Sequence, residues 1–199
     1  SDNNYKNRVG THYNYYMFLP LRSESNITAD QLNSYLVSKG YTSRPTGGSA
    51  GSGQSQMVNT GSTFIAGQNQ YGTNALLVFA MAIHESGYGT SNLSVTKNNL
   101  FGWAAVDSDP SSATPYATVE QSITEQFAYN LRGYMDITDG RFFGTHLGEK
   151  KSGFNVKYAS DPYWGIKIAS YAYEIDKSAG LVDHNYYALG MINTYGIPF

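Results

Sequence analysis

The run ALLVFAMAI at residues 75–83 is the feature that most constrains how this chain can fold. Nine consecutive apolar residues form a helix without a polar face, and such a helix is stable only when other elements cover it on all sides. The run is too short to cross a bilayer, which takes about 20 apolar residues. It continues to His84 and Glu85, and Gly87 and Gly89 then end the helix. We therefore expect a buried central helix that ends at Glu85.

Capping signals predict further helices around this one. The pattern Thr-x-x-Gln at 28–31 and at 118–121 has the spacing of a capping box, and Asp161-Pro162 is typical of the start of a helix. The expected helices run from 28 to about 40, from 64 to 71, from 73 or 74 to 85, from 118 to about 135, from 161 onward and from 185 to 195.

The remaining segments predict a small extended part and one compact unit. Residues 5–22 are expected to form an extended arm, residues 42–62 a Gly/Ser-rich loop and residues 100–106 a short strand. A length of 199 residues fits one domain. We divide it into 1–60, which holds the arm, a helix and the loop, and a body at 61–199 on which they pack. The expected fold class is mainly α, of the α+β type.

Composition excludes several classes of function. The net charge of −2 gives no electrostatic basis for binding nucleic acid or anionic lipid. The absence of cysteine excludes disulfides, thiolate metal sites and cysteine nucleophiles. No apolar run is long enough for membrane insertion, and the polar start SDNN is not a signal peptide. We expect a mature or excised domain that works as a monomer.

The His-Glu pair invites comparison with zinc peptidases, but the spacing does not fit. Those enzymes need His-Glu-x-x-His, which places two imidazoles on one helical face. Here Ser86, Gly87 and Tyr88 follow the pair, and the other histidines, at 12, 146 and 184, lie far from metal-like spacing. We therefore expect no metal and no cofactor.

Glu85 is a candidate general acid. A carboxyl group at the end of a buried apolar helix loses solvation, which raises its pKa and keeps it protonated near neutral pH. A protonated carboxyl group of this kind can protonate a glycosidic oxygen. The alternative is that Glu85 is a partly exposed residue at a helix end and that the glycines only terminate the helix.

Four motifs in order carry a family resemblance. They are AMAIHESGYGTSNLS and KNNLFGWAAVDSDP around Glu85, YATVEQSI at 116–123, and SGFNVKYASDPYWGIKIASYAYEID at 152–176. Together they resemble the glucosaminidase family of bacterial autolysins, glycoside hydrolase family 73, over roughly residues 60–178. The last motif is similar to the LytB-type members that remodel the cell wall.

The resemblance implies a fold and an activity. The fold is a lysozyme-like α-lobe with a small β-lobe flanking a substrate groove. The activity is cleavage of the β-1,4 bond between N-acetylglucosamine and N-acetylmuramic acid in the glycan strands of peptidoglycan, with Glu85 on the position of the catalytic acid. It implies a role in wall remodelling, daughter-cell separation or autolysis, in a secreted or wall-associated protein of a Gram-positive bacterium.

Two further catalytic roles are open. A glycosidase usually has a second carboxylate, and the candidates here are Asp107, which we favour, Asp109 and Glu120. Alternatively, the substrate's own 2-acetamido oxygen attacks the anomeric carbon. Tyr158 matches a tyrosine that the family places near the cleaved bond, where its phenol can orient the acetamido group or stabilise positive charge; otherwise it is a core tyrosine.

Sugar contacts are expected from aromatic and amide side chains. Rings that can stack on sugars are at Phe101, Trp103, Tyr163 and Trp164. For Trp164, which has helical spacing, a place in the core is an equal alternative. Asn98 and Asn99 can bond sugar amides, or can cap the turn that follows them. Two other functions compete with the leading one: a lytic transglycosylase on the same scaffold, and a wall-binding module without activity.

Overall fold

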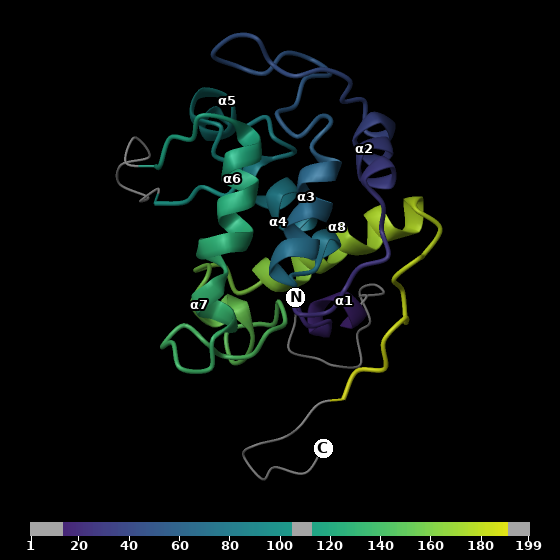
Figure 1. Ribbon diagram of the computed structural model, residues 1–199, viewed down its shortest axis with the longest axis vertical. Coiled ribbons are helices and arrows are strands. Elements are labelled where there is room, and N and C mark those ends of the chain that lie inside the picture. Colours follow the sequence, from purple (N-terminus) through teal and green to yellow (C-terminus); the bar gives the residue numbers. More distant parts are fainter. Residues whose placement is uncertain (1–13, 105–112, 191–199) are drawn as a thin grey trace, which may run out of the picture.

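The computed structural model describes residues 14–104 and 113–190, and this part of the chain is mainly helical (Figure 1). The expected small β-lobe does not emerge from it, since the β pairing within these residues is one parallel bridge between Ser43 and Gln54. Residues 100–104 form turns where a strand was expected, and residues 105–112 lie outside the described part. The helices are α1 (Asn14–Phe18), α2 (Ala29–Ser38), α3 (Gly61–Tyr71), α4 (Ala75–Ser86), α5 (Asn92–Lys97), α6 (Val119–Glu125), α7 (Arg132–Met135) and α8 (Trp164–Ser178), with a π-helical turn η2 (Gln126–Asn130) and a 3-10 turn η3 (Phe154–Val156).

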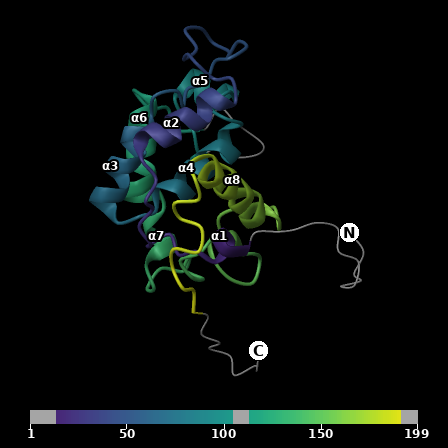
Figure 2. The same cartoon turned by 90° about the vertical axis from the view of Figure 1, so that its right-hand side faces the viewer.

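The apolar run forms α4, which is the central helix. The Asn74 side chain caps its start by accepting a hydrogen bond from the backbone N–H of Leu77 at 2.9 Å. Every residue of 75–83 is 0% exposed. The helix lies between α3 and α8, both of which contact it (Figure 2). The prediction of a buried central helix is therefore confirmed, and its C-terminal end is held in a fixed place.

The helices α2 and α3 pack through a glycine contact. The Thr28 capping box is present in full, because Thr28 and Gln31 each bond the other's backbone N–H. Helix α3 begins at Gly61, three residues before the expected start. A Cβ at Gly61 would lie 2.3 Å from the carbonyl oxygen of Ala29, so only glycine allows this close approach of the two helices.

The long helix expected at 118–135 is interrupted. Thr118 caps α6 by accepting from the backbone N–H of Gln121 at 3.1 Å. At Gln126 the hydrogen-bond spacing widens, and the N–H of Leu131 donates to the Gln126 carbonyl at 3.1 Å. This π-turn separates α6 from α7. The apolar periodicity of the sequence does not reveal it, because the buried stripe continues through the break.

Helix α8 covers α4 with an apolar face. Trp164, Ile168, Ala172 and Ile175 are all at most 2% exposed. The helix begins at Trp164 rather than at Asp161-Pro162, because the Asp161 carboxylate accepts from the N–H of Tyr163 at 2.9 Å and forms a turn there. A Cβ on Gly165 would lie 2.0 Å from the carbonyl oxygen of Gly148, so the start of α8 packs directly on the preceding loop.

The segments at the two ends of the described chain meet over α8. The prediction of an extended arm is wrong for residues 14–18, which form α1, and the Tyr16 hydroxyl donates to the buried Asp176 carboxylate at 2.5 Å. The Asp183 carboxylate accepts from the Ser25 hydroxyl and from the N–H of Asn26. Residues 185–190 are not helical, contrary to the helix expected at 185–195, whose remainder lies outside the described residues.

Candidate active site

Glu85 lies in the last turn of α4, where the buried helix reaches the surface. Its side chain is partly buried. The indole Nε1–H of Trp164, from the first turn of α8, donates to Glu85 Oε1 at 2.7 Å. The carboxyl group is thus fixed by a side chain 79 positions away in the sequence. With Oε1 occupied as an acceptor, Oε2 is left to carry the proton of the neutral acid.

Two opposing effects set the acidity of Glu85. Burial raises the pKa of this carboxyl group, and the hydrogen bond from Trp164 lowers it; the burial effect is the larger, so the pKa lies above the ordinary value. A carboxyl group with a raised pKa keeps its proton at higher pH than an exposed glutamate. This is the electrostatic condition for a general acid.

Tyr158 lies beside this pair, between η3 and α8. Its ring packs against Trp164 with centroids 4.8 Å apart and against Tyr134 at 5.2 Å. Its hydroxyl oxygen accepts a hydrogen bond from Gln126 Nε2 at 3.0 Å. Burial first, and then the nearby Glu85 charge, raise the pKa of the Tyr158 phenol well above its usual value, although the Gln126 hydrogen bond lowers it. The phenol is therefore protonated at neutral pH.

The turn after Glu85 is held in an unusual backbone conformation. Tyr88 has φ +61°, a left-handed value that bulky residues rarely adopt, and it stands between two glycines that also have positive φ. A Cβ on Gly89 would lie 2.8 Å from Ser55 Oγ and 2.9 Å from the backbone nitrogen of Met57. The buried second half of the Gly/Ser-rich loop therefore packs directly on this turn.

His84 lies beside Glu85 but faces other groups. Its ring centroid is 6.2 Å from that of Tyr171. Burial and, to a lesser extent, the charge of Lys167 lower the pKa of His84, which Asp161 partly offsets. Over residues 14–104 and 113–190, no three His, Cys, Asp or Glu side chains lie close enough together to hold a metal ion.

Of the three candidates for the second carboxylate, one is paired with an arginine and two lie outside the described residues. Glu120 is in the first turn of α6 and accepts from Arg44 Nη2 at 2.6 Å. Burial raises the pKa of Glu120, but hydrogen bonds from Arg44, from the backbone and from Thr118, together with the Arg44 charge, outweigh that effect and leave the pKa below its usual value. Asp107 and Asp109 lie in the segment 105–112, which the structure does not describe.

The two asparagines are engaged with the backbone. Asn98 ends α5 with φ +53° and donates to the carbonyl oxygen of Tyr116 at 3.0 Å. Asn99 is 1% exposed. Its Nδ2 donates to the Trp103 and Thr114 carbonyls, and its Oδ1 accepts from two backbone N–H groups of the turn. Of the two interpretations of these residues, the structure places both amides in the capping arrangement.

The four aromatic candidates divide by exposure. Trp164 and Phe101 belong to the core, with 2% and 5% of their surface exposed, so neither ring has a free face for a sugar. Trp103 is partly exposed and Tyr163 is 59% exposed. The structure therefore leaves Trp103 and Tyr163 as possible stacking surfaces, and it gives Trp164 a different role, as the donor to Glu85.

Gln126 is a member of the site that the sequence analysis missed. Gln126 and Asn130 occupy the buried stripe that begins with Val119 and Ile123, and they are 0% and 6% exposed. Two amides on an otherwise apolar stripe are a signal that can be found in a sequence, because a buried amide needs partners. The partner of Gln126, Tyr158, cannot be identified that way, because it comes from a distant segment.

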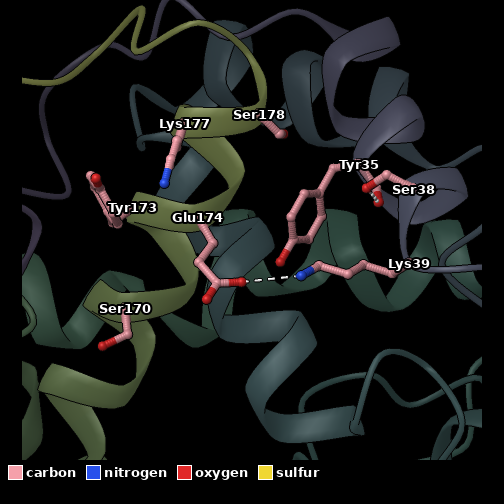
Figure 3. Close-up of a pocket in the computed structure, with 8 residues that line it drawn as sticks. All are labelled: Tyr35, Ser38, Lys39, Ser170, Tyr173, Glu174, Lys177 and Ser178. Atoms are coloured by element: carbon pink, nitrogen blue, oxygen red, sulfur yellow. Dashed lines mark hydrogen bonds and ion pairs between the residues drawn. The ribbon is translucent and has the colours of Figure 1, made fainter.

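A separate surface cavity lies between the end of α2 and the second half of α8 (Figure 3). Its volume is about 610 Å³, and the Lys39 and Glu174 side chains pair across it at 3.1 Å. Glu85 does not line this cavity, whose walls are formed by Tyr35, Ser38, Lys39, Ser170, Tyr173, Glu174, Lys177 and Ser178.

Comparison of the fold with solved structures finds Staphylococcus aureus autolysins. Autolysin E matches with a TM-score of 0.61 over 84% of this chain and 73% of that protein, at 18% identity. A catalytic mutant of autolysin E in complex with the disaccharide NAG-NAM matches with a TM-score of 0.60 over 87% of this chain and 76% of that one, also at 18% identity. At this level of identity the likeness shows a common fold.

Sequence comparison finds relatives of greater length. A Streptococcus pneumoniae serotype 4 protein assigned as an endo-beta-N-acetylglucosaminidase is 41% identical over 127 residues, which cover 63% of this chain and 18% of that protein. The bifunctional autolysin of Staphylococcus aureus is 32% identical over 110 residues, which cover 48% of this chain and 8% of the autolysin. The chain thus spans less than a fifth of the length of these relatives.

The family assignment follows from residues 61–177. They match the family model for glucosaminidase, described as mannosyl-glycoprotein endo-beta-N-acetylglucosaminidase, and they make up more than half of the chain. They contain Glu85, Tyr158 and Trp164, the side chains that the fold brings together. The chain therefore belongs to the glucosaminidase family of glycoside hydrolases.

Proposed function

We propose that this chain is the catalytic domain of a peptidoglycan hydrolase, an endo-β-N-acetylglucosaminidase with Glu85 as its general acid. The observation that carries the proposal is the environment of Glu85: the carboxyl group ends a buried helix, has a raised pKa and accepts a fixed hydrogen bond from Trp164. Membership of the glucosaminidase family and the NAG-NAM disaccharide bound by a structural neighbour support the substrate class.

The proposed reaction is hydrolysis of the β-1,4 bond between N-acetylglucosamine and N-acetylmuramic acid. Glu85 donates the proton on Oε2 to the glycosidic oxygen, which leaves with the muramic acid. The bond from that oxygen to the anomeric carbon of N-acetylglucosamine breaks. Water supplies a hydroxyl group to the anomeric carbon and returns a proton to Glu85, so N-acetylglucosamine becomes the new reducing end.

We propose two alternatives for the group that assists Glu85 in the reaction. Asp107 is our candidate for a second carboxylate, ahead of Asp109. Glu120 is less suited because its carboxylate is already paired with Arg44. On the second route the substrate's 2-acetamido oxygen attacks the anomeric carbon, and Tyr158 orients that group. Trp103 and Tyr163 are the proposed stacking surfaces for the sugars.

The proposed setting is the cell wall of a Gram-positive bacterium, where the enzyme serves remodelling, daughter-cell separation or autolysis. The relatives from Streptococcus pneumoniae and Staphylococcus aureus support this setting. We propose that the domain acts as a monomer. Across the described segments, no helix combines the length and the apolar character that a bilayer span requires.

The test is mass spectrometry of borohydride-reduced fragments that the protein releases from purified walls. We expect reduced N-acetylglucosamine at the fragment ends, and we expect Glu85→Gln to lose the activity while keeping its fold. Glu149→Gln, which changes an exposed glutamate, is the matched control and should remain active.

Four results would contradict the proposal. Near wild-type lysis by Glu85→Gln would remove Glu85 from the mechanism. Reduced muramic acid ends would indicate a muramidase, and 1,6-anhydro-muramic ends would indicate a lytic transglycosylase. Binding to walls without release of sugar would indicate a wall-binding module.

A further inference from the structure

The π-helical turn η2 is a local irregularity beside Tyr158. Its hydrogen bond from Leu131 N–H to the Gln126 carbonyl spans five residues in place of four. Such turns are rare and are frequently found at functional sites. Here the turn begins and ends with two buried amide side chains, Gln126 and Asn130. The π-turn therefore coincides with a pair of buried amide side chains.

The hydrogen bonds of these amides have a defined direction. Asn130 Nδ2 donates to Gln126 Oε1 at 3.1 Å. The Gln126 oxygen is thereby used as an acceptor, and its NH₂ group faces Tyr158, to whose oxygen it donates at 3.0 Å. Because Gln126 presents hydrogens to the phenol, the phenol's own hydrogen has to point toward another acceptor.

The described part of the chain offers no acceptor for this hydrogen. Within residues 14–104 and 113–190, Gln126 is the hydrogen-bond partner of the Tyr158 hydroxyl. The ring cannot turn away easily, since Trp164 and Tyr134 pack against it. Trp164 also holds Glu85, and the charge of Glu85 is close enough to act on the phenol. The Tyr158 hydroxyl therefore lies near the proposed acid, and none of the described residues accepts its hydrogen.

We propose that Gln126 is a positioning residue that makes Tyr158 a hydrogen-bond donor to the carbonyl oxygen of the substrate's 2-acetamido group. This inference rests on the proposed function. The acetamido group is attached to the carbon next to the anomeric centre, so its carbonyl is a strong acceptor close to the bond whose oxygen Glu85 protonates. The alternative role of Tyr158, stabilising positive charge through its oxygen lone pair, is disfavoured because Gln126 already occupies that oxygen.

The inference predicts an order of activities in a series at position 126. Gln126→Glu keeps the shape but offers a carboxylate that accepts the Tyr158 hydrogen and turns it away from the substrate. We expect its kcat on soluble glycan strands to fall about a hundredfold, the typical effect of removing one positioned donor, and to match Tyr158→Phe. Gln126→Met supplies neither donor nor acceptor, leaves the hydroxyl free to rotate, and should lose less. KM should change little in each variant.

A double-mutant cycle separates this role from a merely structural one. If Gln126 acts through the Tyr158 hydroxyl, Gln126→Glu should cost almost nothing further in a Tyr158→Phe background. The same loss in both backgrounds, or a Gln126→Glu variant as active as wild type, would overturn the inference. Gln70→Glu, on the exposed face of α3, is the matched control and should keep full activity.

The outcome also separates this inference from the proposed function. Wild-type release of N-acetylglucosamine ends together with an inactive Glu85→Gln variant upholds the proposed function, whatever the position-126 series shows. Thermal unfolding identifies any variant that fails to fold. If Gln126→Glu does not fold, the remaining variants decide. We then expect kcat to decrease from wild type to Gln126→Met to Tyr158→Phe, and a Gln126→Met variant with wild-type kcat would contradict the inference.

Discussion

Trp164 is expected to set the pH range over which Glu85 works as an acid. Its indole N–H donates to Glu85 Oε1 at 2.7 Å from a side chain that is 2% exposed, so water cannot replace it freely. A hydrogen bond to a charged group contributes about 1.5–3 kcal/mol. In Trp164→Phe the carboxylate loses this stabilisation, while burial, which raises the pKa of Glu85, remains. The ionisation constant of Glu85 should therefore fall by more than about tenfold, since about 1.36 kcal/mol corresponds to a factor of ten.

The assay is the pH dependence of wall lysis. A general acid is active in its protonated form, so the rate declines as the pH rises through the pKa of Glu85. The alkaline decline of Trp164→Phe should lie at higher pH than that of wild type. Trp103→Phe is the matched control, because it changes the other tryptophan of the chain and should leave the profile in place.

Fluorescence provides an independent measurement of the same group. In Trp103→Phe, Trp164 is the sole tryptophan, and its emission should change with pH as the hydrogen-bonded carboxyl group ionises. The midpoint should lie above about 4.3, the ordinary value for glutamate. Adding Glu85→Gln should remove the change. An alkaline decline in Trp164→Phe that stays in place or moves to lower pH would refute the reasoning, because water entering the smaller side chain's site would then outweigh the lost hydrogen bond.

Three further predictions follow from the packing and the charges. Because the pKa of Glu85 is raised in the folded protein, the stability of wild type is highest below the pKa that Glu85 has in the unfolded chain, and it falls as the pH rises through the folded pKa. Glu85→Gln should therefore melt at a higher temperature than wild type at pH 8 and at the same temperature near pH 4. Equal melting temperatures of the two proteins at both pH values would contradict this. Gly165→Ala should lower the free energy of unfolding by about 1–3 kcal/mol, because the added Cβ would lie 2.0 Å from the Gly148 carbonyl oxygen. Denaturant titration measures this free energy. The control is Gly140→Ala, whose added Cβ has no atom within 4 Å. Glu120→Gln should keep most of the lytic activity and cost less than about 1 kcal/mol of stability, because its ion pair with Arg44 is partly exposed to water. A loss of activity as large as that of Glu85→Gln would make Glu120 the second carboxylate.

Local signals in the sequence were enough for most helices and for the position of Glu85. The caps at Thr28, Asn74 and Thr118 depend on residues within three positions, and the apolar run of α4 can only be buried. The elements that the sequence predicted wrongly depend on contacts between distant segments. Helix α1 has five residues and is fixed by packing on α8, and no local pattern marks so short a helix.

The candidate site likewise divides into locally predictable and long-range parts. The sequence indicated an acid at Glu85, and the family resemblance indicated a tyrosine at 158, but for Trp164 the alternatives were a sugar platform or a place in the core, not a hydrogen bond to Glu85. Its burial and its bond to Glu85 arise only when α8 crosses α4. A buried tryptophan does need an acceptor for its N–H, so the sequence implied that a partner existed without naming it. No local motif connects Gln126 with Tyr158, which comes from a distant segment.

The contact between residues 14–26 and 183–190 over α8 decides how short a fragment of this domain can be and still fold. The family match ends at residue 177, one position after Asp176, and begins at 61, after Tyr16 and Ser25. A fragment trimmed to that match would keep Asp176 but lose the Tyr16 hydroxyl and the Asp183 backbone N–H that satisfy its carboxylate. An interior carboxylate stripped of its donors is strongly destabilising. The portable unit for domain grafting or for a minimal lytic reagent therefore extends at least from α1 to Asp183.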